Sequence, residues 1–363
     1  MDKEAILKTV LNHKLQINNE SLNYIYNNYY SEDKLLNLIN FTKTRKSYII
    51  TLNIINEFEN ELKKMEIQPI LVKESIPLPE KISIEELIQD KILTYEKVKD
   101  LLRNRWELIN ITSINKITKN TKKFSLIAEV IDFDKNNKII ELQDNTKLLK
   151  ASVSDLNENL LSLVEKGDIL GFVCENNGNI KITNIIFPDI PLFKASKTQV
   201  NNSALIFSYG LFESEDILNK LIEKVSKEYN FFHIFDFEDS LLIKKELKNV
   251  TIIQNTEKVK LFSIFNFNVL LSHQSIFSPN KPIINQMINF LKKRIIYYHK
   301  INNIQFLPFI IDIVPDFFVT NGGNNIQYNY KNTILLSIDK ILKENIFYII
   351  DLNKQECLKM DLF

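Results

Sequence analysis

The chain has 363 residues, 45% of them hydrophobic and 25% charged, so it can bury a core of ordinary globular size. This length predicts two or three domains. The formal net charge of +1 excludes a strongly basic protein that binds nucleic acid by charge alone, because phosphate neutralisation supplies most non-specific affinity. The two cysteines, Cys174 and Cys357, cannot build a zinc ribbon or a disulfide framework. The first residues lack the apolar core of a signal peptide, and no segment reaches the roughly 20 apolar residues of a membrane span, so we expect an intracellular protein without membrane contact.

The first 65 residues have the spacing of amphipathic helices. Ile6, Leu7, Val10 and Leu11 recur at helical intervals, and similar apolar spacing continues to the end of this stretch. We therefore predict an N-terminal helical module over residues 1–65.

Residues 66–82 contain three prolines among extended apolar residues and are predicted to be a linker. Ser83 and Glu86 then have the spacing of a capping box, which marks the start of a helix. A further helical stretch is expected over Tyr95–Ile109.

Residues 83–192 are predicted to form a helix followed by a β-barrel. From Phe124 the apolar period changes to two, which is typical of strands. Five strands with a helical insert, Leu156–Val164, between the third and fourth give the element order of an OB fold. The five predicted strands are Phe124–Phe133, Ile139–Gln143, Lys147–Val153, Ile169–Cys174 and Ile180–Phe187.

Beyond residue 200, short apolar strands alternate with helical stretches, which predicts a layered domain over residues 200–363. The predicted helices are Glu215–Ser226 and Lys281–Lys300, and a terminal hairpin is expected from Phe347–Leu352 with Cys357–Phe363. The other predicted strands are Ala204–Phe207, Phe231–Phe235, Thr251–Ile253, Phe267–Leu271, Pro315–Thr320 and Thr333–Ser337.

Two short runs are more specific than the element order. Phe187–Pro191 reads Phe-Pro-Asp-Ile-Pro after the last barrel strand, and Val314–Phe317 reads Val-Pro-Asp-Phe before a strand and a turn. With the order of elements over residues 85–363, they resemble the small subunit of archaeal DNA polymerase D and the related B subunits of eukaryotic replicative polymerases. The resemblance implies an α+β multidomain fold with an N-terminal helical module, an OB-fold barrel and a calcineurin-like phosphoesterase β-sandwich flanked by helices.

In that family the phosphoesterase domain holds two metal ions with residues from five motifs at strand ends. Two neighbouring cations of this kind activate water and hold the phosphate, and a further histidine protonates the leaving oxygen. When the family's motifs are matched to this sequence position by position, metal-ligand residue types remain at Asp236, Asn255 and His273. The positions that have lost their ligands are Tyr209, Leu211, Gly322 and Asn324. The catalytic histidine is replaced by Thr256.

The histidine count gives a second argument for a degenerate site. The full motif set needs five histidines, and the chain has four in total, His13, His233, His273 and His299. We therefore expect no catalytic residue and no bound cofactor. The alternative is a weakly bound Mn²⁺ or other divalent cation held by the three remaining ligands.

Two groups of basic residues are candidates for nucleic-acid contact. Lys116, Lys119, Lys122 and Lys123 precede the first barrel strand, and OB barrels often bind single strands with a basic groove and stacked aromatic residues. The barrel strands carry few aromatic residues, which favours a solvated or protein-docking face instead. We interpret a second group, Lys292–Arg294 on the long predicted helix, in the same way.

The resemblance implies an accessory subunit that supports DNA replication as a docking platform. Its partner is the large catalytic subunit of the polymerase, and it meets DNA through that heterodimeric holoenzyme at the nucleoid. One alternative is an active Mn²⁺-dependent 3′–5′ exonuclease whose rearranged site uses Asp239, Glu257 or partner residues. Another is an OB-fold module that binds single strands outside replication.

Overall fold

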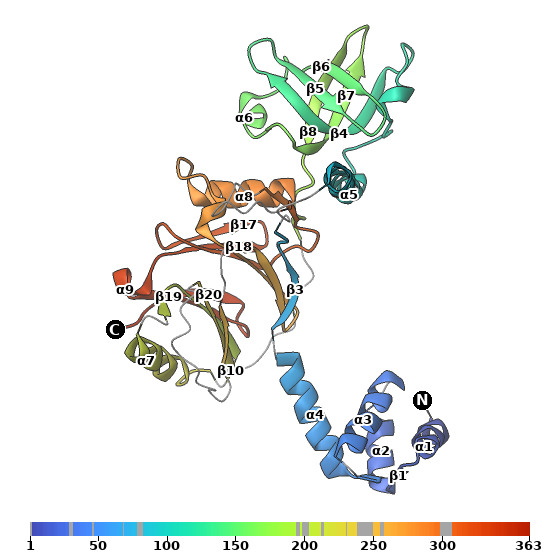
Figure 1. Cartoon of the computed structure of the whole chain (residues 1–363), viewed down its shortest axis with the longest axis vertical. Helices are drawn as coiled ribbons and strands as arrows, with labels where there is room; N and C mark the ends of the chain where they lie inside the picture. The colour runs from blue at the N-terminus through green and yellow to red at the C-terminus, as the bar shows by residue number, and fades with distance from the viewer. Residues whose placement is uncertain are drawn as a thin grey trace. The chain divides into compact units, whose positions relative to one another are not determined.

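The structure is a computed structural model that describes residues 2–28, 32–45, 47–67, 69–77, 83–193, 197, 203–211, 214–229, 231–237, 250–254, 258–297 and 307–363. The chain forms two compact units, Met1–Pro69 and Ile70–Phe363 (Figure 1). It is a mixed α+β protein with several sheets. Across these described ranges, no helix is long and apolar enough to cross a bilayer.

The first unit is helical, as predicted, with one short parallel strand pair. Ile6 and Val10 are fully buried, whereas Leu11 is 54% exposed. The buried apolar face of this first helix is therefore narrower than the sequence indicates. The elements are α1 (Lys3–Asn12), β1 (Gln16–Ile17), α2 (Asn19–Asn27), α3 (Glu32–Thr44), β2 (Ile49–Ile50) and α4 (Leu52–Ile67).

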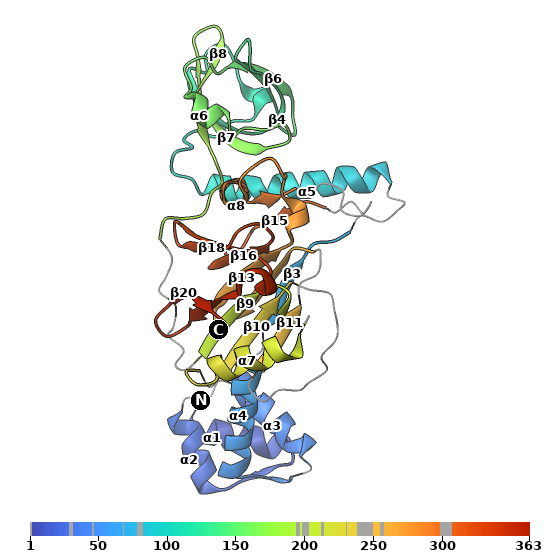
Figure 2. The same cartoon turned by 90° about the vertical axis from the view of Figure 1, so that its left-hand side faces the viewer.

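In the second unit, the five predicted barrel strands are confirmed and close into a barrel in the order β4-β5-β6-β8-β7 (Figure 2). Their inward residues form one apolar cluster that includes Leu126, Leu142 and Phe172. The elements are η1 (Ile114–Lys116), β4 (Lys123–Asp134), β5 (Ile139–Gln143), β6 (Leu148–Ser152), α6 (Glu158–Leu161), β7 (Ile169–Asn176) and β8 (Ile180–Ile186).

The helix α5 (Ile84–Arg103) precedes the barrel and packs against it. It begins with the predicted capping box, since the Ser83 hydroxyl accepts from the Glu86 amide and the Glu86 carboxylate accepts from the Ser83 amide. It ends at Arg103, six residues before the predicted end. Its buried face packs on β4 and β7, and the Tyr95 hydroxyl donates to the carbonyl of Ile127 at 2.7 Å.

Two sheets form a sandwich in the remainder of this unit. The first sheet has the order β11-β10-β9-β19-β20, with β9, β10 and β11 parallel. Its strands are β9 (Ser203–Ser208), β10 (Phe231–Asp236), β11 (Val250–Gln254), β19 (Ile346–Asp351) and β20 (Glu356–Asp361), and β19 with β20 confirms the predicted terminal hairpin.

The second sheet has the order β17-β18-β16-β13-β12-β3, with β13, β16 and β18 parallel. Its strands are β3 (Ile70–Glu74), β12 (Lys260–Ile264), β13 (Phe267–Ser272), β16 (Phe317–Asn321), β17 (Ile326–Tyr330) and β18 (Thr333–Ile338). The segment 66–82, expected to be a linker, therefore contributes the edge strand β3.

Three apolar clusters give the sandwich four layers. Phe207, Phe235 and Phe317 belong to the cluster between the two sheets. A second cluster joins the outer face of the first sheet to α7 (Glu215–Val225), and a third joins the outer face of the second sheet to α8 (Ile283–Lys293) (Figures 1 and 2). The strands and helices predicted beyond residue 200 thus lie in layers, together with β3 from outside that range. The remaining short elements are η3 (Gln274–Ile276), β14 (Ile295–Ile296), β15 (Phe309–Ile310) and α9 (Ile341–Glu344).

The prediction of a long helix over Lys281–Lys300 is wrong in its length. The helix ends at Lys293, because Arg294 adopts a left-handed backbone with φ of 57° and the chain continues as β14. Residues 298–300 of the predicted helix lie outside the described residues.

Candidate functional site

The carboxyl ends of the parallel strands of both sheets meet at one edge of the sandwich, which we call the carboxyl edge. The Ile341 amide, just after β18, donates to the carbonyl of Tyr209, just after β9, at 2.8 Å. The ammonium of Lys340 lies 5.4 Å from the centre of the Tyr209 ring. Ligand sites in α/β proteins commonly form beyond the carboxyl ends of parallel strands. The predicted metal ligands would therefore have to lie together at this edge.

Asp236 ends β10 and is fully buried. One of its carboxylate oxygens accepts from the Ser208 hydroxyl at 3.0 Å and from the Leu211 amide at 3.3 Å. A buried carboxylate needs such donors to offset its loss of hydration. These two bonds hold the end of β9 and the following turn against β10, which gives Asp236 a structural role.

Tyr209 and Leu211, two of the positions predicted to have lost a ligand, pack in the apolar core. Leu211 is fully buried in the cluster between the first sheet and α7. Tyr209 is partly buried beneath Lys340 and packs against the cluster between the sheets. Both residues therefore contribute to the apolar core and offer no metal ligand.

His273 is half-buried and caps the short turn η3. Its Nδ1 accepts from the Ser275 amide at 3.2 Å and lies 2.8 Å from the Ser275 hydroxyl. This ring nitrogen is engaged in local structure.

The position of Gly322 is covered by the side chain of Gln274. A Cβ atom built on Gly322 would lie 1.9 Å from the side-chain oxygen Oε1 of Gln274. The backbone amide of Gln274 donates to Oδ1 of Asn321 at 2.8 Å. A histidine at position 322 would displace this glutamine. Asn324 is exposed, so the turn offers no inward ligand at either lost position.

Asn255 and Thr256 lie outside the described residues, as do Asp239 and Glu257. Within the described part of the chain, no three histidine, cysteine or acidic side chains gather in a way that could hold a metal ion. The donors at the carboxyl edge that the structure describes do not fit a binuclear metal centre.

The four candidate lysines are all exposed. Lys116, Lys119 and Lys122 lie in the segment that leads into β4, and Lys123 is its first residue. Lys123 forms an ion pair with Glu175 at 2.9 Å. All residues of the barrel strands are described, and the aromatic side chains on them are buried or partly buried, so these strands offer no exposed aromatic side chain for base stacking.

A cluster of buried charges joins the barrel to the sandwich, and sequence reasoning missed it. The ammonium of Lys293 forms ion pairs with Asp168 at 2.9 Å and Glu165 at 2.8 Å, and its side chain is only 7% exposed. The Tyr297 hydroxyl donates to the carbonyl of Gly167 at 3.0 Å. Burial raises the pKa of Asp168 to about 6, although Lys293 opposes the shift.

The prediction of a solvated or docking face for Lys292–Arg294 is therefore wrong for two of its residues. Lys293 and Arg294 are 6% and 3% exposed. Arg294 donates to the carbonyl oxygens of Ile311 and Asp312, and burial lowers its pKa to about 10.

The run Phe187–Pro191 forms a second connection between barrel and sandwich. Both carboxylate oxygens of Asp189 accept from the Tyr330 hydroxyl at 3.0 Å, and one pairs with Lys331 at 2.7 Å. Arg105, two residues after the end of α5, donates twice to the carbonyl of Phe187 at 3.2 and 3.1 Å. The motif that sequence reasoning singled out thus fixes the exit of the barrel to the second sheet.

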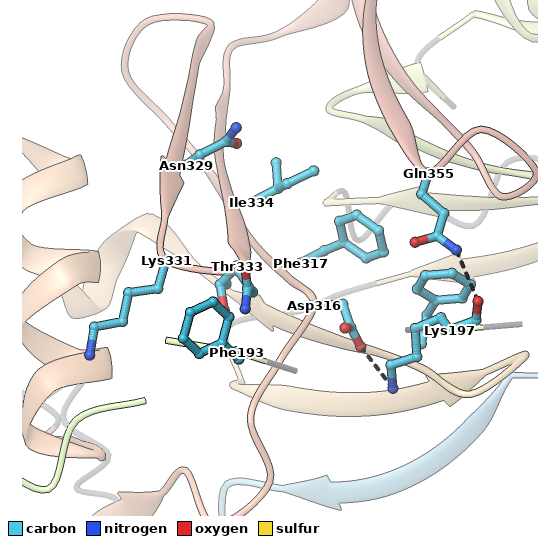
Figure 3. Close-up of a pocket in the computed structure, with 11 residues that line it drawn as sticks. Phe193, Lys197, Asp316, Phe317, Asn329, Lys331, Thr333, Ile334 and Gln355 are labelled. Atoms are coloured by element: carbon cyan, nitrogen blue, oxygen red, sulfur yellow. Dashed lines mark hydrogen bonds and ion pairs between the residues drawn. The ribbon is translucent and has the colours of Figure 1, made fainter. Parts of the chain in front are cut away.

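A pocket of about 400 Å³ lies at the opposite edge, near the amino ends of β16 and β18 (Figure 3). Phe317 and Ile334 line its apolar part, and the carboxamides of Asn329 and Gln355 lie on its rim. Figure 3 shows Lys197 between Asp316, its ion-pair partner at 3.6 Å, and Gln355, which donates to its carbonyl at 3.1 Å.

No family model matches the sequence, and no curated protein is similar to it. A similar solved structure is a conserved uncharacterised protein of Streptococcus pneumoniae described as a predicted phosphoesterase, with a TM-score of 0.28 and 8% identity over 44% of this chain and 83% of that one. A Thermotoga maritima protein has a TM-score of 0.27 and 13% identity over 44% of this chain and 97% of that one. The telomere capping protein Ten1 from Saccharomyces pombe has a TM-score of 0.17 and 16% identity over 32% of this chain and 94% of that one. At these TM-scores the similarities carry no argument.

Proposed function

We propose that this chain is the accessory small subunit of a D-family replicative DNA polymerase and that it acts as a docking platform for the large catalytic subunit. In this proposal the barrel is an OB fold and the sandwich is a calcineurin-like phosphoesterase domain that has lost its own exonuclease activity. The closed barrel order β4-β5-β6-β8-β7, followed by Phe187–Pro191 and a four-layered sandwich, supports the assignment.

The observation that carries the docking role is the fixed attachment of the barrel to the sandwich. Lys293 forms ion pairs with the buried Asp168 and the half-exposed Glu165 of the barrel. Asp189, just after the barrel, accepts from the ammonium of Lys331 in the β17–β18 turn. Such an interface specifies one relative position of two domains. A platform needs a fixed geometry, because a partner that contacts both domains loses affinity when it must also order them.

The surface of α5 supports the same role. The face that packs on the barrel at Tyr95 continues toward the start of the helix as Ile84, Ile88 and Ile92, which are 73%, 53% and 42% exposed. Contiguous exposed apolar residues commonly mark protein–protein contacts.

The donors at the carboxyl edge support the loss of activity. Removing metal ligands takes away the Lewis acid and the activated water together. Asp236 and His273 also carry structural hydrogen bonds of their own.

The test is co-expression of the chain with the large subunit of a D-family polymerase from the same genome. We expect a stable complex that survives gel filtration, and no release of nucleotides by this chain with Mn²⁺. A large subunit that does not bind would refute the platform. Nuclease activity that His273→Ala abolishes would support the rearranged exonuclease instead.

A further inference from the structure

The second sheet ends in a strand whose outer edge is open. Among the strands that the structure describes, β17 pairs with β18 alone. Its side chains are largely exposed, with Ile326 at 40% and Tyr328 at 48%. An edge strand presents a row of backbone donors and acceptors that another strand can use.

β17 lacks the devices that usually protect such an edge, which are charged residues, proline and bulges. Its sequence, Ile-Gln-Tyr-Asn-Tyr, has no charge and no proline, and its register with β18 is regular. The other edge of the same sheet, β3, carries Lys73 and Glu74 and faces a register shift in its partner strand. The edge strand β20 of the first sheet carries Glu356, Lys359 and Asp361.

The two faces of β17 specify what an added strand would contact. Side chains alternate along a strand, so Ile326 and Tyr328 lie on the same face as Tyr330, which packs with the cluster beneath α8. Partly buried Ile284 and Ile288 of α8 belong to that layer. An added strand would therefore place apolar side chains at every second position over this face.

The pocket in Figure 3 lies at the carboxyl end of the same strand, on its other face. Asn329 and Lys331 lie on its rim, and Phe317 and Ile334 give it an apolar lining. The charges of Lys197 and Asp316 offset each other, so the pocket suits a large apolar or aromatic side chain rather than an ion.

Self-pairing of β17 between two copies of the chain does not fit this edge well. Five residues span only about 17 Å, and one such strand pair falls well short of the roughly 1,000 Å² that a stable interface buries. A longer segment of another protein that continues beyond the strand can supply the remaining area.

We propose that β17 receives an extended, alternately apolar segment of the large polymerase subunit as an added strand. This inference rests on the proposed function and names one of the surfaces on which the partner docks. Main-chain hydrogen bonds supply affinity in such strand addition, and the alternate side chains supply specificity.

The experiment measures binding of the purified large subunit to the full chain and to two variants. Tyr328→Lys places a charge on the edge where an apolar contact is expected, and we predict at least about tenfold weaker binding. Leu342→Lys is the matched control, since Leu342 is 50% exposed on α9, and we predict binding within about twofold of the unchanged chain. Circular dichroism of each variant checks that it is folded.

Hydrogen exchange of the complex separates strand addition from simple side-chain contact. We expect amides within Ile326–Tyr330 to exchange at least about tenfold more slowly when the large subunit is bound. Binding without this protection, or equal binding by Tyr328→Lys, overturns the proposal while the platform stands. Dimerisation of the chain alone that Tyr328→Lys abolishes also overturns it, in favour of self-pairing. Failure of the unchanged chain to bind the large subunit refutes both the platform and the added strand.

Discussion

Replacing Lys293 by methionine tests whether buried charge joins the barrel to the sandwich. Methionine keeps most of the length and volume of the side chain, so the change removes the charge and leaves the packing largely in place. The substitution leaves Asp168, only 2% exposed, without its cation and with one remaining backbone donor, the Glu165 amide at 2.7 Å.

The expected loss depends on pH because Asp168 can take up a proton. Breaking a buried ion pair costs about 3–5 kcal/mol when the other charge stays buried. Burial already raises the pKa of Asp168 to about 6, and Lys293 is the main influence that lowers it. Without Lys293 the pKa rises further, so the carboxyl group of the folded variant is neutral over a wider range of pH.

The direction in which stability changes with pH follows from proton uptake by Asp168. A carboxyl group whose pKa is higher in the folded state than in the unfolded state binds more protons when folded, so stability falls as pH rises between the two values. The unchanged protein loses this contribution between about pH 4 and pH 6, and Lys293→Met extends the loss to higher pH. We therefore expect a destabilisation of about 3–5 kcal/mol near pH 8 and about 1 kcal/mol near pH 5, where only the half-exposed pair with Glu165 is lost.

Native-state hydrogen exchange of β7 and α8 amides measures this loss without contribution from the separate unit Met1–Pro69. Lys281→Met is the matched control, because Lys281 pairs with the same Glu165 at 3.2 Å but both side chains are more than half exposed. The control should lose at most about 1 kcal/mol at either pH. Equal losses for Lys293→Met near pH 5 and pH 8 would show that Lys293 does not neutralise Asp168.

Three further substitutions test other parts of the structure. Asp189→Asn removes the carboxylate partner of Lys331, whose ammonium keeps its hydrogen bond to the carbonyl of Ile190, and should cost about 1–3 kcal/mol in urea unfolding. Burial and Asp189 together raise the pKa of Tyr330, so this tyrosine should ionise at lower pH in the variant, as measured by absorbance titration. Gly171→Ala places a Cβ 2.6 Å from a methyl group of Leu108 and should cost about 1–3 kcal/mol, part of which Leu108→Ala restores. Asp236→Ala leaves two buried donors unpaired and should lower the melting temperature by an amount equivalent to about 2–4 kcal/mol, equally with and without Mn²⁺; a loss seen only with Mn²⁺ would show that Asp236 holds a metal.

The barrel was predictable strand by strand because its residues alternate and its turns are punctuated by polar residues. β5 has the predicted bounds, Ile139–Gln143, and β4 differs by one residue at each end. Such a pattern is local, so it survives without knowledge of the tertiary structure. By contrast, β3 (Ile-Leu-Val-Lys-Glu) shows no alternation, and β17 alternates over only five largely exposed residues that follow the turn at Gly322. Pairing with β12 and with β18 is what makes these two segments strands.

The charges at the interface were not predictable for a related reason. Lys293 lies in a basic run, which is usually solvated, and its partner Glu165 is 128 residues away in the sequence. Local sequence carries no signal for a contact at that separation. Phe187–Pro191 was recognised as a motif, but its physical role depends on Tyr330 and Lys331, which lie in a turn that the sequence does not connect to it.

The candidate site shows what a retained residue can and cannot indicate. Of the three predicted remaining ligands, Asp236 and His273 are described, and each makes local hydrogen bonds that hold a strand end or a turn. These bonds are a physical reason for a polar residue at each position, because its removal would leave hydrogen-bond donors unpaired. At Gly322, one of the positions predicted to have lost a ligand, the Gln274 side chain fills the space that a larger residue would need. The presence of Asp236 and His273 is therefore explained without a bound cation, so these two residues alone do not indicate a metal site.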